Sequence, residues 1–185
     1  IKQSQSGLNI MTAKPNIYIA DLRHVADGAM ANNCMPLGIG YMKAVMDRDL
    51  PEVESQIFTY PDHLLNEIKS EPPDVLMLTN YVWNERLARH FTNVAKRMRQ
   101  NTLVVAGGPN IPVETKLETE FFGGWNNLDV YALGEGDFLA TEIVNRFLDA
   151  NKSITKFFSA CALGTIKSRK EAKLSTPFSS SARMV

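Results

Sequence analysis

Short apolar runs alternate along the chain with longer segments of helical periodicity. The runs lie at residues 17–20, 53–58, 75–78, 103–106 and 130–133. Three of them are unbroken, as expected for strands that are buried on both faces of a sheet. The more polar run at 53–58 favours an edge strand.

Helical patterns fill the gaps between these runs. Predicted helices cover residues 36–50, 62–70, 84–99 and 137–150, with a weaker helix at 112–122. Asn84 is a residue type that can cap a helix start, and the apolar positions that follow it have helical spacing. The opposite face of that helix is basic, and we interpret it as a solvated surface. It carries Arg86, Arg89, Lys96, Arg97 and Arg99.

The alternation of strands and helices predicts an α/β fold with helices on both faces of a parallel sheet. Five strands in about 140 residues favour a flavodoxin-like (Rossmann-like) doubly wound five-stranded parallel sheet of order 2-1-3-4-5. Ligands of such sheets bind at the carboxyl ends of the strands. The loops at that edge are residues 21–36, 79–84, 106–112 and 133–137.

Two of these loops combine features that suit ligand binding. Tyr81 and Trp83 follow a buried strand and can form an apolar wall beside small polar groups, or they can pack on neighbouring helices. Gly107-Gly108-Pro109 lets the main chain approach a ligand closely. A valine at Gly108 is therefore expected to weaken binding and to leave the fold intact.

The two remaining loops allow two interpretations each. Gly134-Glu135-Gly136 presents a carboxylate at a helix start, where the helix dipole favours it, so Glu135 is a ligand contact or a structural cap. Loop 21–36 is unusually long for a compact domain. It is either functional or an ordinary surface loop.

Composition limits the function classes. The 185 residues include 20 basic and 20 acidic residues, and 44% of the chain is hydrophobic. The length and the hydrophobic share predict one folded domain. The balanced charge argues against a nucleic-acid partner, which usually needs a basic excess. The sequence also contains no apolar run of the roughly 20 residues that a membrane span needs. Cys34 and Cys161 are too few for a disulfide framework, which favours the cytoplasm.

Charge and serine content divide the chain. Residues 157–185 carry five basic residues and one acidic residue. We therefore predict a flexible N-terminal extension at 1–13, a folded domain at 14–156, and a basic, serine-rich tail or truncated linker at 157–185.

Several familiar sites are missing from the sequence. The first predicted strand is followed by neither a G-x-G-x-x-G nor a P-loop motif, and a G-x-S-x-G nucleophile motif does not occur. Thr79 and Gly134 stand where a phospho-acceptor receiver domain needs Asp and Lys. His, Cys and Asp residues do not show the spacing of a metal site, so we predict no metal ligands and no catalytic residues.

Five segments together resemble a known family. Asp21-Leu22, Met35 to Tyr41, Pro73 to Asn84, Ala106 to Pro109 and Gly134 to Asp137 occur in the order and at the spacing of cobalamin-binding domains that precede radical S-adenosylmethionine enzymes. This resemblance covers nearly all of the predicted domain.

The resemblance implies that cobalamin lies against the carboxyl edge of the sheet. The cofactor-binding residues that it implies are Leu37, Gly38, Thr79, Asn80, Tyr81, Val82, Trp83, Gly107, Gly108, Pro109, Gly134, Glu135 and Gly136. The corrin plane would face a radical S-adenosylmethionine domain in cis or in trans, which holds S-adenosylmethionine and an iron–sulfur cluster. The chain lacks that domain's Cys-x-x-x-Cys-x-x-Cys motif. It therefore corresponds to the cobalamin-binding half of a methyltransferase-like protein and is not expected to be catalytic by itself.

The sequence after the first predicted strand differs from the motif that supplies the lower cobalt ligand in a related group of cobalamin domains. Methionine synthase-type domains use Asp-x-His-x-x-Gly after the first strand, whereas His24 stands three residues after Asp21. The radical-enzyme class often lacks this histidine. We therefore predict that His24 is not an obligatory cobalt ligand, and the lower axial ligand stays unassigned.

Two other functions remain open from sequence. A flavodoxin-like module could stack another cofactor, such as flavin mononucleotide, on its aromatic residues, although no Ser/Thr-rich phosphate loop follows the first strand. A ligand-free interaction domain would instead use the basic helix face to contact a protein partner.

Overall fold

The computed structural model describes residues 13–26, 29–30, 35–112, 114–161 and 182–184. Five parallel strands form the central sheet in the order β4-β1-β5-β6-β7, which confirms the predicted 2-1-3-4-5 topology. Their bounds are β1 Asn16–Ala20, β4 Glu54–Phe58, β5 Val75–Thr79, β6 Leu103–Gly107 and β7 Val130–Ala132.

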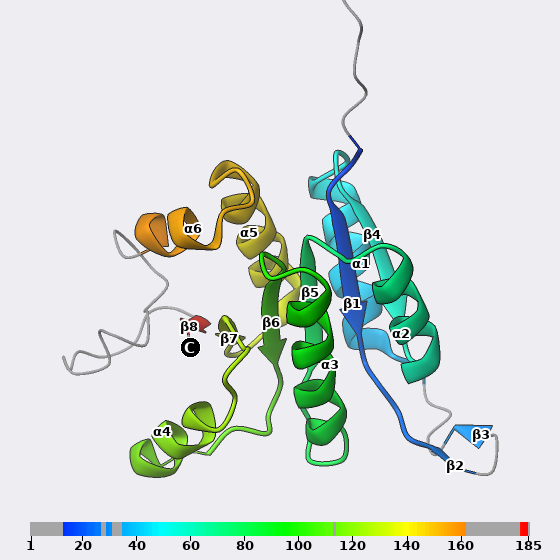
Figure 1. Cartoon of the computed structure of the whole chain (residues 1–185), viewed down its shortest axis with the longest axis vertical. Helices are drawn as coiled ribbons and strands as arrows, with labels where there is room; N and C mark the ends of the chain where they lie inside the picture. Colours follow the sequence, from blue (N-terminus) through cyan, green and yellow to red (C-terminus); the bar gives the residue numbers. More distant parts are fainter. Residues whose placement is uncertain (1–12, 27–28, 31–34, 113, 162–181, 185) are drawn as a thin grey trace, which may run out of the picture.

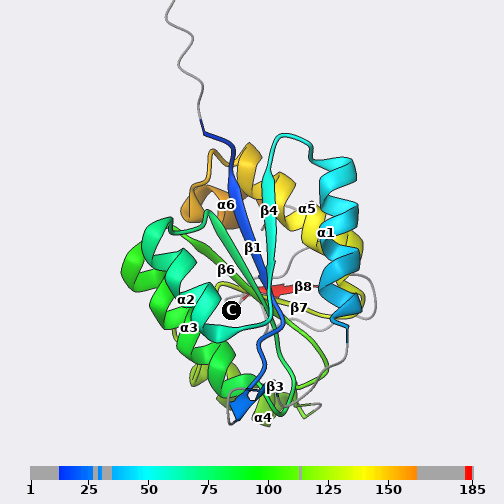
Figure 2. The same ribbon diagram turned by 90° about the vertical axis from the view of Figure 1, so that its right-hand side faces the viewer.

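Helices cover both faces of this sheet (Figures 1 and 2). The side chains of α1, α5 and α6 pack in one apolar core, and those of α2, α3 and α4 pack in a second core on the opposite face. The helices are α1 Leu37–Asp49, α2 Pro61–Ser70, α3 Glu85–Met98, α4 Thr115–Gly123, α5 Gly136–Asp149 and α6 Ile154–Cys161.

Alternation along each central strand explains the unbroken apolar runs. In β1, Ile17 and Ile19 belong to the first core, while Tyr18 and Ala20 belong to the second. Successive side chains of a strand point to opposite faces, so a strand covered on both faces needs apolar residues at every position. β4 instead mixes exposed, half-buried and buried positions, as predicted for a more polar edge strand.

Among the described residues, three features of the fold were not predicted: one hairpin, one strand and one helix. A short hairpin of β2 Val25–Ala26 and β3 Ala29–Met30 lies in loop 21–36. β8 Ala182–Met184 pairs antiparallel with β7. The third is helix α6, Ile154–Cys161, whose Phe157 is fully buried. The predicted domain boundary after residue 156 therefore falls inside this helix. Residues 1–12, Cys34 and residues 162–181 of the predicted extensions and loops lie outside the described residues.

The solvated interpretation of the basic face on α3 is wrong for Lys96, while Arg89 and Arg99 are partly exposed members of ion pairs. The Lys96 side chain is only 8% exposed, and its ammonium lies 2.6 Å from the Asp129 carboxylate. Arg99 pairs with Asp74 at 2.6 Å, and Arg89 pairs with Glu85 at 2.8 Å. Long side chains can lie along the protein surface and reach internal partners. Arg86 and Arg97 are exposed, as predicted.

Within the described parts of the chain, the helices are too short and too polar to cross a lipid bilayer.

Candidate functional site

A cavity of about 160 Å³ lies at the carboxyl edge of the sheet. Its floor is apolar and includes Ile19, Met77 and Val105 from three neighbouring strands, and α1 and α5 supply its sides. Seven of the thirteen predicted site residues line it: Gly38, Thr79, Tyr81, Gly107, Gly108, Gly134 and Gly136. The fold thus brings together three loops and the start of α1, which are far apart in sequence.

The other predicted residues have different positions. Leu37, Val82 and Trp83 are exposed by 62%, 80% and 58% at the same edge, outside the cavity. Pro109 and Glu135 are exposed, whereas Asn80 is fully buried beneath the loops. Exposed apolar side chains also occur at positions that were not predicted, at the starts of α1 and α5: Met35, Tyr41 and Phe138.

Tyr81 and Trp83 stack on each other. Their ring centroids are 4.6 Å apart and their planes differ by 5°. Tyr81 lines the cavity, while Trp83 is largely exposed. The pair therefore presents an apolar surface at the mouth of the cavity, and the alternative of Trp83 packing on neighbouring helices is wrong.

A chain of side-chain hydrogen bonds holds the loop that carries these rings. The Asn84 amide donates to the Thr79 hydroxyl at 3.0 Å, and that hydroxyl donates to Asp21 Oδ1 at 2.8 Å. Asn84 Oδ1 accepts the Tyr81 N–H at 2.8 Å. Asn84 is the N-cap residue of α3, but its side chain makes no capping hydrogen bond there. The expectation of a capping side chain was wrong because the loop uses both of its polar atoms.

His24 also contacts this loop. Its Nε2 lies 2.6 Å from the main-chain oxygen of Trp83. A carbonyl oxygen only accepts hydrogen bonds, so this geometry assigns the proton to Nε2. Nε2 then has no lone pair to offer a metal. Among the described residues, no group of three or more His, Cys, Asp or Glu side chains is placed to hold a metal ion.

The glycines around the cavity have different physical roles. Gly108 has φ +135°, and a Cβ atom there would lie 2.5 Å from the main-chain oxygen of Asn80. In the described structure, a Cβ on Gly38 would meet no heavy atom within 4 Å. Gly108 is therefore required by packing inside the protein, whereas Gly38 leaves open space beside the cavity.

Glu135 does not act as a side-chain cap in the part of the chain that the structure describes. It occupies the N-cap position of α5, yet its exposed carboxylate makes no capping hydrogen bond. Asp137, in the first turn of α5, lines the cavity instead. The carboxylate nearest the cavity is thus two residues beyond the predicted one.

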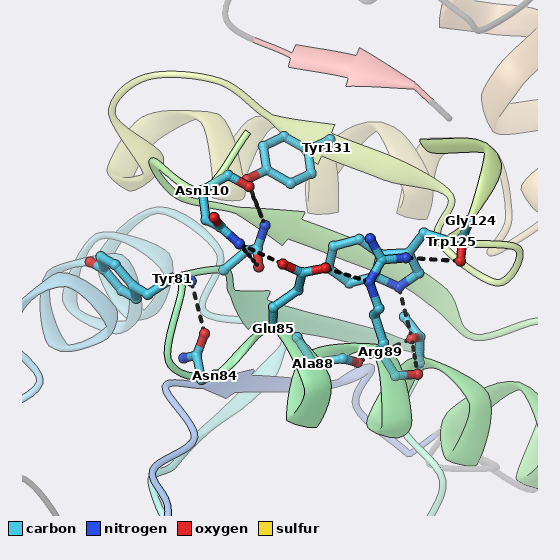
Figure 3. A network of polar contacts seen from close by, with 11 residues as sticks. Tyr81, Asn84, Glu85, Ala88, Arg89, Asn110, Gly124, Trp125 and Tyr131 are labelled. Carbon is cyan, nitrogen blue, oxygen red and sulfur yellow. Dashed lines mark hydrogen bonds and ion pairs between the residues drawn. The ribbon is translucent and has the colours of Figure 1, made fainter. Parts of the chain in front are cut away.

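A buried polar network lies under the glycine loop of residues 107–110 (Figure 3). The Asn80 amide donates to the Asn110 carbonyl at 2.8 Å and to the Tyr131 hydroxyl at 3.1 Å. That hydroxyl donates to the Gly108 carbonyl at 2.9 Å. Burial raises the pKa of the Tyr131 phenol, although the hydrogen bond from Asn80 acts in the opposite direction.

The network continues to α3 and α4. The Asn110 amide donates to Glu85 Oε2 at 2.8 Å, and Arg89 donates to Glu85 Oε1 at 2.8 Å. The Arg89 guanidinium also donates to the Gly124 carbonyl and lies 4.6 Å from the centre of the Trp125 ring. Sequence reasoning missed these residues. The available signal was a tyrosine inside an apolar strand, since a buried tyrosine hydroxyl needs a partner.

The fold and the cavity define a flavodoxin-like α/β domain with a candidate ligand site at the carboxyl edge of its sheet. The chain is similar to two curated proteins. It is 31% identical over 115 residues to the cobalamin-dependent radical SAM methyltransferase TokK of Streptomyces tokunonensis. It is 30% identical over 115 residues to the 2-(S-pantetheinyl)-carbapenam-3-carboxylate methyltransferase of Streptantibioticus cattleyicolor.

Each similarity covers 60% of this chain and 16% of the relative. The chain therefore matches about one sixth of the length of these methyltransferases. No family model matches it.

Proposed function

We propose that the chain is the cobalamin-binding part of a cobalamin-dependent radical S-adenosylmethionine methyltransferase. The observation that carries this proposal is the cavity at the carboxyl edge, with exposed aromatic and aliphatic side chains at its mouth. Similarity to a protein named for cobalamin and radical SAM chemistry supports it. A radical S-adenosylmethionine domain, in cis or in trans, would hold S-adenosylmethionine and the iron–sulfur cluster.

The shape of the site fits the two unlike parts of cobalamin. A corrin ring is too large for a cavity of about 160 Å³, but its face suits the exposed surface made by Trp83 and Val82. The apolar floor suits the flat aromatic base of the nucleotide tail, and Gly38 leaves room for it. Apolar pockets with a few fixed polar groups are typical of cofactor sites.

The chain's own residues would bind and orient the cofactor. The main-chain N–H and C=O groups of the glycine loops offer hydrogen bonds to amides and to the ribose phosphate tail. The Thr79 hydroxyl already donates its proton to Asp21, so it would accept one further hydrogen bond from an amide of the cofactor. The stacked Tyr81 and Trp83 rings would keep water from one face of the corrin. Cobalamin, when bound, supplies the organometallic chemistry itself.

A binding experiment tests this proposal. Purified protein is mixed with hydroxocobalamin, desalted, and examined by visible absorption; a retained cobalamin spectrum is expected. Cobinamide, which lacks the nucleotide tail, serves as the matched probe and should bind at least about tenfold more weakly, or roughly 1.4 kcal/mol. Protein that stays colourless at saturating hydroxocobalamin contradicts the proposal, and equal affinity for cobinamide contradicts a tail in the cavity.

Flavin mononucleotide is the second candidate, favoured by the stacked aromatic pair, which could hold an isoalloxazine ring. The same protein is incubated with flavin mononucleotide, desalted and denatured. Released flavin fluorescence would favour this candidate. If flavin and cobalamin bind at different places on the protein, adding hydroxocobalamin should not displace the flavin.

A further inference from the structure

The glycine loop of residues 107–110 is held from three sides by groups that do not line the cavity. Asn80 at the end of β5, Tyr131 in β7 and Glu85 at the start of α3 all bond to it directly. The side of the loop formed by Gly107 and Gly108 lines the cavity. The polar network and the candidate ligand site therefore lie on opposite sides of one short segment.

Tyr131 is the central member of this arrangement. Its side chain is fully buried, and its hydroxyl accepts from the Asn80 amide and donates to the Gly108 carbonyl. Buried polar groups with all partners in place hold one conformation firmly, because an unmade hydrogen bond in the interior is costly. Because the Tyr131 hydroxyl holds the Gly108 carbonyl in one direction, the neighbouring peptide units are held as well. Gly107 and Gly108 in this segment line the cavity.

We infer that Tyr131 is a positioning residue that shapes the cofactor site through the glycine loop, before any ligand is bound. This inference rests on the proposed function for the identity of the ligand. Beyond the proposed function, the inference states that affinity for cobalamin depends on the Tyr131 hydroxyl, although Tyr131 does not line the cavity. Glu85 supports the same loop from α3, because its carboxylate accepts a hydrogen bond from the Asn110 amide.

The chain contains a matched control in Tyr18. Both tyrosines are fully buried strand residues of the same apolar core. The Tyr18 hydroxyl donates to the Glu71 carbonyl at 2.9 Å and accepts from the Asn16 amide at 2.9 Å. Asn16 begins β1, so this pair lies at the amino edge of the sheet, opposite the cavity. Phenylalanine at either position removes one hydroxyl with the same two kinds of partner.

The first experiment compares hydroxocobalamin affinity in wild type, Tyr131→Phe and Tyr18→Phe, below the melting temperature of each. Tyr131→Phe should bind about fivefold more weakly or worse, and Tyr18→Phe should stay within about twofold of wild type. Equal affinities in the two variants would overturn the inference. Should Tyr131→Phe fail to fold, Asn110→Ala, on the half-buried loop surface, replaces it with the same expectation.

The second experiment uses no ligand. Amide hydrogen exchange of Asn110 and Ile111, whose N–H groups bond to the main-chain oxygens of Asn80 and Pro109, is followed by NMR. Exchange should be several-fold faster in Tyr131→Phe than in Tyr18→Phe once global stability is matched with urea. Identical exchange would show that the hydroxyl does not shape the loop.

The two experiments separate the proposals. A wild type that fails to retain hydroxocobalamin removes the proposed function, while the exchange data still decide whether Tyr131 fixes the loop. If the wild type binds hydroxocobalamin and the two variants bind it with equal affinity, the proposed function stands and only the inference about Tyr131 is rejected.

Discussion

The main-chain oxygen of Asn80 lies 2.5 Å from the point that a Cβ atom on Gly108 would occupy. The space next to Gly108 is therefore filled by the protein itself. A valine there cannot act as a clean probe of ligand binding, so the expectation that Gly108→Val leaves the fold intact is wrong.

Gly108→Ala should destabilise the fold. The new Cβ clashes with a main-chain group that cannot move freely, and φ of +135° is strained for any other residue. We expect a loss of about 2 kcal/mol or more, measured by urea denaturation. Gly136→Ala is the control, since its Cβ would meet the flexible Met42 side chain at 3.4 Å. Equal stability of the two variants would contradict this account of the loop.

Gly38 is a better probe of the cavity. Leucine at Gly38 should fill space beside the cavity and weaken hydroxocobalamin binding by at least about tenfold. Gly40 lies on the same helix, also has open space around its Cβ position, and does not line the cavity. Both Gly38→Leu and Gly40→Leu remove a helical glycine, so each should gain up to about 1 kcal/mol of stability. Weaker binding in both variants would show that the helix, and not the cavity, is responsible.

Trp83→Ala should separate binding from stability. The ring is 58% exposed and its main contact is the stack on Tyr81, so its loss should cost about 1 kcal/mol of stability. Hydroxocobalamin affinity should fall at least about tenfold, or 1.4 kcal/mol. Tyr60→Ala, which loses a ring contact with His63 and does not line the cavity, should bind normally. Normal binding by Trp83→Ala would remove the aromatic pair from the site.

His24→Ala should leave the visible spectrum of bound cobalamin unchanged. Nε2 of His24 is engaged with the Trp83 carbonyl, and the loop lacks the spacing of a histidine-ligand motif. Affinity should fall only modestly, through the lost support of Trp83. The measurement that decides is paramagnetic resonance of the cobalt(II) form. A nitrogen splitting in wild type that disappears in His24→Ala would identify a histidine ligand, with Asp21 as the group that orients it.

Stability should decrease at alkaline pH because two buried phenols resist ionisation. Burial raises the pKa of Tyr18 to about 12, although the hydrogen bond from Asn16 lowers it, and burial also raises the pKa of Tyr131. An unfolded tyrosine has a pKa of about 10. The stabilising effect is complete below pH 10 and is lost as pH rises from 10 towards 12, since the folded state keeps the proton longer.

Urea denaturation between pH 8 and pH 11 tests this dependence. Tyr18→Phe should flatten the alkaline decrease relative to wild type, and Tyr131→Phe should do so in the same direction. A decrease of the same size in Tyr18→Phe would assign it to other groups.

Much of the fold was determined by local sequence. The apolar runs at β1, β5 and β6 identified strands buried on both faces, because a sheet covered by helices excludes polar side chains from both surfaces of its central strands. Alternation of strands and helices then left few topologies to consider, and the predicted order was confirmed. The loops at the carboxyl edge followed from that order, since all parallel strands end at the same side.

Tertiary structure alone decided what each loop residue does. Gly108 and Gly38 are the same residue type near strand or helix ends, yet one faces the Asn80 main chain and the other faces open space. Lys96 belongs to one helical face with Arg86, but only its partner Asp129, on a distant segment, accounts for its removal from solvent. β8 is stabilised by pairing with β7 and has little signal of its own. These outcomes depend on contacts between residues far apart in the chain, and a periodic pattern of apolar and polar positions carries no information about such pairs.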